Sequence, residues 1–101
     1  MRRTPTTLAV ARELLKGEPD QPRWSYEVAS AIEADRGTVS SILTRMACRG
    51  WLAGRWEDVA QVSLRRRPRH LYQVTQDGTT GLARLVDGRN NDGSIGTVAE
   101  N

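Results

Sequence analysis

Apolar residues recur at helical spacing in the first part of the chain, and this pattern predicts its first elements. The stretch 5–17 places leucines and alanines on one face and opens with a proline, with Thr4 as the expected N-cap. A short second helix is expected to follow Ser25 as its N-cap, with Trp24 folded back over its first turn. The segment 18–23 contains two prolines and no periodicity, so it is expected to be a connecting loop.

A third helix is predicted over residues 36–49, where apolar and polar positions separate clearly. Asp35 can cap this helix, and Gly50 can end it in the left-handed conformation. At about 100° per residue, one face is apolar and the opposite face carries short polar side chains beside an arginine. The apolar face comprises Val39, Ile42, Leu43 and Met46, and the polar face comprises Ser41, Thr44, Arg45 and Cys48.

Period-two alternation replaces helical spacing after residue 50 and predicts a β-hairpin. The two strands are expected within "WLAGRWEDV" and "HLYQVT", with Gly54 marking a bulge or a close approach. Four arginines in five positions, residues 65–69, lie between these strands and would form part of a long tip. Pro68 lacks a backbone N–H, which favours a place at the tip or at an edge.

The chain then predicts one more helix and a tail. Thr75 can cap a short last helix, which Gly78 and Gly81 weaken. Residues beyond this helix are rich in glycine and asparagine and lack an apolar period, so we expect disorder there. The expected organisation is a folded domain over 1–87 and a disordered tail over 88–101.

Three helices, a hairpin and a short last helix predict an α+β fold, in the chain order of a winged helix-turn-helix domain. In that fold the third helix enters the major groove of double-stranded DNA and the hairpin forms the wing. We therefore expect residues 36–49 in the groove and the arginine-rich wing, 59–70, on phosphates or in the minor groove.

Composition narrows the chemistry further. The 101 residues suit a single domain, and 13 of the 15 Lys and Arg residues lie in 1–76, against 8 of the 12 acidic residues. One cysteine and one histidine supply neither a disulfide nor a four-ligand zinc site, so no cofactor or metal is expected. Cys48 and His70 also lack a third orienting group, so we expect no enzyme. No long apolar run or secretory pattern is present, and a cytoplasmic location without membrane contact is expected.

Short motifs resemble those of the PadR-like transcriptional regulators over about residues 5–86. In the helices, S-Y-E-V at 25–28 resembles the family's G-Y-E-L, G-T-V at 37–39 resembles G-T-L, and R-M with G-W at 45–51 resembles R-L-x-x-x-G-L. In the hairpin, W-E at 56–57 resembles the strand that follows in the family. R-P-R-H-L-Y-Q-V-T at 67–75, with Gly78, resembles the family's R-P-R-K-Y-Y-x-L-T-x-x-G. The resemblance implies a winged helix-turn-helix regulator. Ser40-Ser41 replaces the family's usual Tyr-Pro, and no counterpart appears of the long C-terminal helix through which members dimerise and beside which some bind aromatic effectors.

The leading hypothesis is a sequence-specific DNA-binding transcriptional regulator that represses a promoter by occupying it. A homodimer is expected, because one small domain makes few base contacts. The candidate DNA contacts are Arg36, Thr38, Ser40, Ser41, Thr44 and Arg45 of the third helix, and Arg65, Arg66, Arg67, Arg69 and His70 of the wing.

Other interpretations stay open at this point. The polar face can be the solvated side of an amphipathic helix, and the arginine run a solvated loop. A winged-helix protein-interaction adaptor has the same pattern, because fold does not fix function. A third hypothesis is an architectural or recombination factor that bends DNA. The operator, the target gene and any small-molecule effector stay undetermined.

Overall fold

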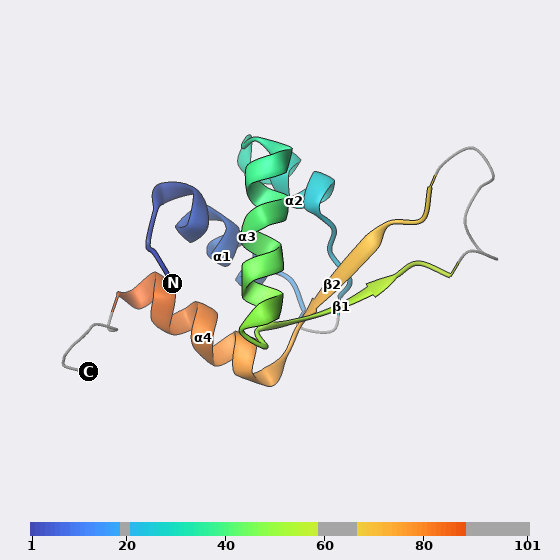
Figure 1. The fold of residues 1–101 in the computed structure, drawn as a ribbon. Helices are drawn as coiled ribbons and strands as arrows, with labels where there is room; N and C mark the ends of the chain where they lie inside the picture. Colours follow the sequence, from blue (N-terminus) through green and yellow to red (C-terminus); the bar gives the residue numbers. More distant parts are fainter. Residues whose placement is uncertain (19–20, 59–66, 89–101) are drawn as a thin grey trace.

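The computed structural model describes residues 1–18, 21–58 and 67–88 and has the predicted order of elements (Figure 1). The described residues form α1 (Pro5–Lys16), α2 (Ser25–Ile32), α3 (Arg36–Cys48), β1 (Leu52–Trp56), β2 (His70–Val74) and α4 (Gln76–Asp87). This is an α+β winged helix-turn-helix fold, in which α2 and α3 form the helix-turn-helix and the hairpin forms the wing. The predicted hairpin tip and the predicted tail fall on residues 59–66 and 89–101, outside the described residues.

Three of the four predicted N-caps are confirmed. The side chains of Thr4, Asp35 and Thr75 each accept a hydrogen bond from the backbone N–H three residues later, at 2.9 to 3.2 Å. These bonds satisfy donors that a helix start leaves without an intrahelical partner. Gly50 adopts the predicted left-handed conformation, with φ +82°, just after α3.

The predicted cap of α2 is wrong. Ser25 is the first helical residue, and Trp24 occupies the N-cap position without a side-chain capping bond. The reason lies in the preceding residue, because the backbone of Arg23 exchanges two hydrogen bonds with Tyr72 of β2, at 2.8 and 2.7 Å. This pairing continues an extended backbone through Trp24, so helical turns begin only after it. Trp24 does stack on Tyr26 in the first turn, with ring centroids 5.4 Å apart.

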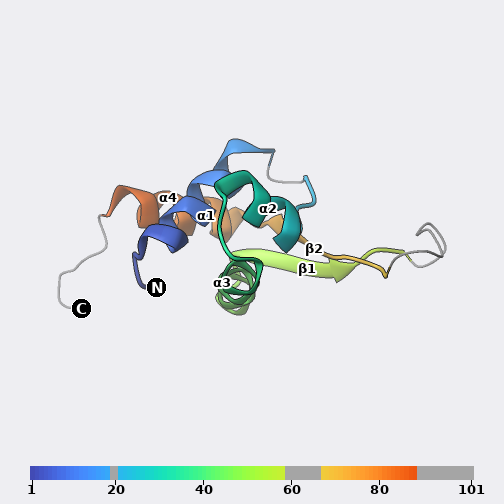
Figure 2. The ribbon, with the colours of Figure 1, turned by 90° about the horizontal axis from the view of Figure 1, so that it is seen from above.

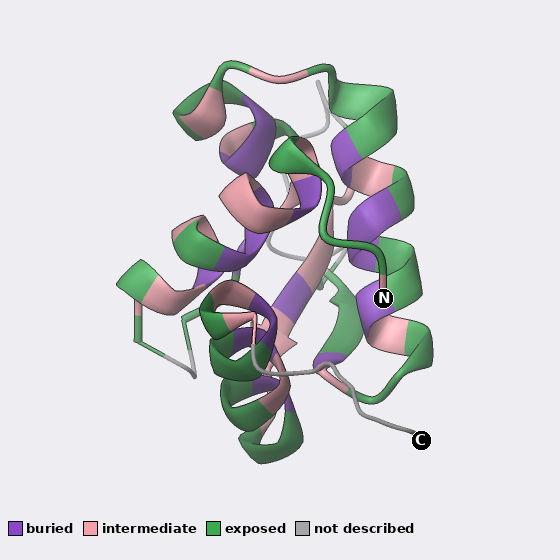
Figure 3. Cartoon of the chain, turned by 90° about the vertical axis from the view of Figure 1, so that its left-hand side faces the viewer, coloured by how far each residue is buried: buried purple, intermediate pink, exposed green. Residues whose placement is uncertain are grey.

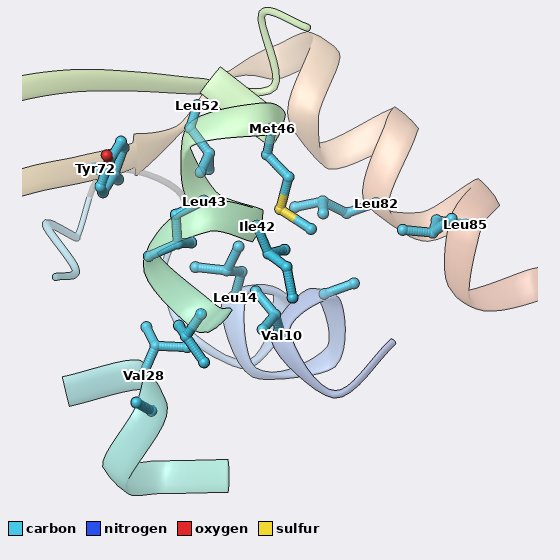
Figure 4. Close-up of a cluster of buried hydrophobic side chains, with 13 residues drawn as sticks. Val10, Leu14, Val28, Ile42, Leu43, Met46, Leu52, Tyr72, Leu82 and Leu85 are labelled. Carbon is cyan, nitrogen blue, oxygen red and sulfur yellow. The ribbon is translucent and has the colours of Figure 1, made fainter. Parts of the chain in front are cut away.

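The core gathers around α3, which contacts α1, α2 and β1. All four residues of its predicted apolar face are buried. Figure 4 shows the side chain of Met46 pointing toward Leu82 of α4 and that of Ile42 toward Val10 of α1. In Figure 3 the buried residues lie on the inward faces of the helices. Among the described residues, no helix has the length and apolar character needed to cross a membrane.

The wing is a regular antiparallel pair whose register runs from Leu52 opposite Val74 to Trp56 opposite His70. It projects away from the helices (Figures 1 and 2). Gly54 marks a close approach, since a Cβ there would crowd the imidazole of His70. The unbroken register through Gly54 excludes a bulge at this position.

The glycines of α4 have a packing role. A Cβ at Gly78 would overlap the backbone carbonyl of Trp51, and a Cβ at Gly81 would overlap its indole ring. Both residues weaken the helix intrinsically, yet they allow α4 to approach the turn between α3 and β1. Thr75 reinforces this approach, because its backbone N–H donates to the Trp51 carbonyl at 3.0 Å and its hydroxyl donates to the Gly50 carbonyl at 2.6 Å.

A buried arginine joins the helices to the wing. Arg23 is 8% exposed; its Nε donates to Glu27 at 2.9 Å and its Nη2 donates to the Glu13 carboxylate at 2.7 Å. Burial opposes the charged form of Arg23, but the hydrogen bonds and charges of Glu13 and Glu27 together outweigh it, so its pKa is raised. Because its backbone also pairs with Tyr72, this one residue connects α1, α2 and β2. From the sequence, Arg23 is expected only in a connecting loop.

Gly78→Ala should destabilise the protein although alanine favours helix. The added Cβ meets a backbone carbonyl, and such overpacking typically costs about 1–3 kcal/mol, which exceeds the helix-propensity gain of about 1 kcal/mol. Thr80→Ala is the control, because Thr80 is exposed on the same helix. Urea unfolding should show a loss for Gly78→Ala and a slight gain for the control. A gain for both would refute the packing role.

Arg23→Ala should lower the free energy of unfolding by about 3 kcal/mol, because it removes the buried partner of the nearly buried Glu13 carboxylate and leaves that carboxylate only an exposed cation. Lys16→Ala is a matched control, since Lys16 pairs with the same Glu13 at 3.6 Å but its side chain is 75% exposed. That exposed pair should contribute less than about 1 kcal/mol. Equal losses of unfolding free energy for the two variants, measured by urea unfolding, would show that the buried contacts of Arg23 do not stabilise the fold.

Candidate nucleic-acid interface

The polar face of α3 is free of the other helices. Figure 2 looks along this helix and shows it at the margin of the body, with α1, α2 and α4 on one side only. The exposed side chains on α3 include Arg36, Thr38, Ser41, Thr44 and Arg45, whereas Ser40 is half-buried. The structure thus brings the six residues proposed from this helix onto one element, five of them open to solvent.

Two hydroxyls of this face already make local hydrogen bonds. Thr38 donates through its backbone N–H and its hydroxyl to Oδ2 of Asp35, at 2.9 and 3.1 Å. These bonds from Thr38 lower the pKa of the Asp35 carboxyl. Thr44 donates its hydroxyl to the Ser40 carbonyl at 3.0 Å. A hydroxyl that donates keeps its lone pairs, so Thr38 and Thr44 are suited to accept hydrogen bonds from a ligand.

An aromatic pair connects the start of α3 with the root of the wing. The guanidinium of Arg69 lies 4.1 Å from the ring centroid of Trp24, and that of Arg36 lies 5.4 Å from the ring centroid of Tyr26. Trp24 and Tyr26 stack on each other, so the four side chains form one ladder. Nε of Arg69 is buried and has no hydrogen-bond partner among the described residues. Cation–π contact holds both guanidinium planes against rings.

This ladder was not predicted from sequence. Two aromatic residues separated by one position at the start of a helix were the available signal. The arginines that cover them lie farther along the chain, Arg36 10 positions after Tyr26 and Arg69 45 positions after Trp24, so no local pattern joins them. Arg69 is also paired through its backbone, since its N–H donates to the Glu57 carboxylate at 2.8 Å and its carbonyl accepts from the Glu57 N–H at 2.9 Å. Arg69 is therefore held at the wing root by both backbone and side chain.

The described part of the wing carries a second aromatic stack. His70 lies between Trp56 and Tyr72, with ring centroids 4.8 and 4.6 Å away. Its ring is therefore packed against both neighbours rather than extended on its own. Arg67 is exposed, whereas Arg65 and Arg66 lie outside the described residues. Among the wing residues proposed to contact DNA, the structure thus places Arg67, Arg69 and His70.

The segment before α1 lies beside α3 on the side away from the wing (Figures 1 and 2). Arg3 anchors it, because its Nε donates to the Leu85 carbonyl at 2.9 Å near the end of α4. Arg2 lines two open hollows along α3, and Arg45 lines both with it. Burial and the nearby Arg49 lower the pKa of the Met1 amino group. The sequence predicts no role for this segment, because two arginines before a helix cap show no periodicity.

The described residues contain no group of three or more His, Cys, Asp or Glu side chains that could hold a metal ion. The hollows beside α3 are lined mainly by arginine, threonine and serine side chains. Cationic and hydroxyl groups of this kind suit contacts to phosphates and to base edges.

No family model matches the chain, and no curated protein matches it. Its fold is similar to that of solved structures, including the following two. One is a transcriptional regulator homologue from Pyrococcus horikoshii OT3, with a TM-score of 0.61 and 18% identity, covering 83% of this chain and 75% of the other. The second is the circadian clock associated protein Pex from Anabaena, with a TM-score of 0.58 and 18% identity, covering 80% and 73%. The order of elements and these two likenesses together identify the fold as a winged helix-turn-helix.

Proposed function

We propose that this protein is a sequence-specific DNA-binding transcriptional regulator. The observation that carries the proposal is the free polar face of α3, which presents Arg45 between exposed hydroxyl residues beside a cationic wing. A major groove about 12 Å wide admits one α-helix. The likeness to a protein described as a transcriptional regulator homologue supports this function. The motifs that resemble PadR-like regulators support the same class.

Direct readout is assigned to α3. The forked guanidinium of Arg45 can donate to the O6 and N7 acceptors of one guanine. Ser41 can donate or accept, whereas Thr38 and Thr44 suit bases that present N–H donors. Arg36 and Ser40 complete the proposed contacts of this helix. Binding alone would suffice for function, and occupation of a promoter would repress it.

The wing is assigned to the DNA backbone. Arg65, Arg66 and Arg67 are long cations that can reach phosphates without reading bases. Arg69 and His70 are proposed contacts too, but stacking on Trp24, Trp56 and Tyr72 fixes their side chains. Their contribution is therefore expected to include holding the wing in place.

A homodimer on paired half-sites is proposed, because a single small domain makes few base contacts. α1 and α4 lie against each other and carry the half-buried Leu8, Leu15 and Val86 on their surface. These residues are the proposed source of the dimer contact.

A protein-interaction adaptor is the second candidate, and one observation favours it. Trp56 is 66% exposed and Tyr26 is 50% exposed, and aromatic side chains are enriched at protein interfaces. An adaptor of this kind would bind its partner with weak dependence on salt and would show little affinity for DNA.

Selection from random duplexes should enrich a defined motif, whose symmetry would report the number of bound copies. On that motif Arg45→Ala should cost about 1–3 kcal/mol, with a much smaller loss on random DNA. Arg67→Ala should instead weaken both duplexes alike and reduce the salt slope by about one.

The measurement is equilibrium binding to both duplexes over a salt series. Arg12→Ala serves as the control, because it removes the same charge from an exposed position on α1. If Arg67→Ala changes the sequence preference and Arg45→Ala lowers the affinity for both duplexes equally, then the wing reads bases and α3 contacts the backbone, the reverse of the proposal. If no motif is enriched and the affinity for DNA is weak and independent of salt, the regulator hypothesis is wrong and the adaptor hypothesis is favoured.

A further inference from the structure

We propose that Arg2 is a third DNA-contacting element, which binds a backbone phosphate on the side of α3 opposite the wing. This inference rests on the proposed DNA-binding function and adds a contact that neither the third helix nor the wing supplies. The protein would then hold α3 in the groove from both flanks.

Arg2 lines two hollows along the polar face of α3. A hollow of about 500 Å³ lies between Arg2, Ser41 and Arg45, and its wall includes the cap of α3. A second hollow of about 460 Å³ is lined by Met1, Arg2, Thr44, Arg45, Cys48 and Arg49. Arg2 and Arg45 line both hollows, so Arg2 lies along the same polar face of α3 that is proposed to read bases.

Charge provides the second step. The hollow beside the last turns of α3 is lined by three arginines and by no carboxylate. The other hollow includes Asp35, whose carboxylate is engaged by the N–H and hydroxyl of Thr38. Among the described residues, no carboxylate pairs with Arg2 or Arg45. Unneutralised cations gathered in one concave surface favour a polyanion.

The third step is the anchor that holds the segment in place. Arg3 donates from Nε to the Leu85 carbonyl at 2.9 Å and from Nη2 to the Val86 carbonyl at 3.5 Å. These carbonyls lie in the last turn of α4, where a helix leaves acceptors unsatisfied and favours a cation. Gly88, with φ +74°, allows the guanidinium of Arg3 to approach closely. Arg3 is thus a positioning residue, and Arg2 is left exposed.

The width of the major groove places phosphates on both sides of α3. A helix of about 10–12 Å diameter fills a major groove of about 12 Å, so groups beside the helix meet the phosphates that border the groove. The wing lies on one side of α3 and the segment 1–4 lies on the other (Figures 1 and 2). The bordering strand that the wing leaves uncovered is therefore the one within reach of Arg2.

The test compares Arg2→Ala with Arg12→Ala, which removes the same net charge from α1, on the selected motif and on a random duplex. Arg2→Ala should reduce the salt slope by about 0.9 on both duplexes, and its fold-loss in affinity should be about 3.5-fold larger at 50 mM than at 200 mM salt. Arg2→Lys should restore most of the affinity. The melting temperature should stay unchanged in both variants, because Arg2 is exposed.

Arg3→Gln provides a second variant. Loss of its charged anchor should free the segment and reproduce most of the Arg2→Ala effect, although Arg2 itself is intact. If the unchanged protein binds DNA with a steep salt slope but Arg2→Ala matches Arg12→Ala, the inference is wrong and the proposed function stands. If the unchanged protein binds no duplex, both fail together.

Discussion

The arrangement of the helices and the wing depends on one buried cation. Arg23 places a guanidinium between Glu13 of α1 and Glu27 of α2 while its backbone pairs with Tyr72 of β2. A charge withdrawn from water is tolerated only where partners surround it closely, so the positions of all three elements are constrained at once. The same pairing keeps the backbone of Trp24 extended and sets the residue at which α2 begins.

That constraint reaches the proposed interface through neighbouring side chains. Trp24 follows Arg23 directly and stacks on Tyr26, and the guanidiniums of Arg69 and Arg36 cover the two rings. The root of the wing and the first turn of α3 are therefore fixed relative to α2. A preorganised pair of elements loses less conformational entropy on binding than two independent ones. The close approach of α4 to Trp51, which Gly78 and Gly81 allow, supports the other end of α3.

The proposed interface is consequently assembled from segments that lie far apart in sequence. α3 contributes the polar face, the wing contributes cations on one flank, and the segment before α1 contributes Arg2 on the other. Arg3 joins that segment to the end of α4, so the first and last described elements meet beside the helix. The side chains gathered there offer hydrogen bonds and positive charge.

The sequence by itself determined the elements and the side of α3 that faces solvent. Helical periodicity, the capping residues Thr4, Asp35 and Thr75, and strand alternation are local signals, because each depends on neighbours within a few positions. The polar side chains proposed for base contact could be predicted for the same reason. Only the tertiary structure decided three features: the buried contacts of Arg23, the stacked ladder through Trp24, and the position of Arg2 beside α3. Each depends on residues brought together from distant parts of the chain. The prediction of Ser25 as an N-cap was wrong for this reason. The local capping preference of serine is weaker than the backbone pairing of Arg23 with a strand nearly fifty residues away.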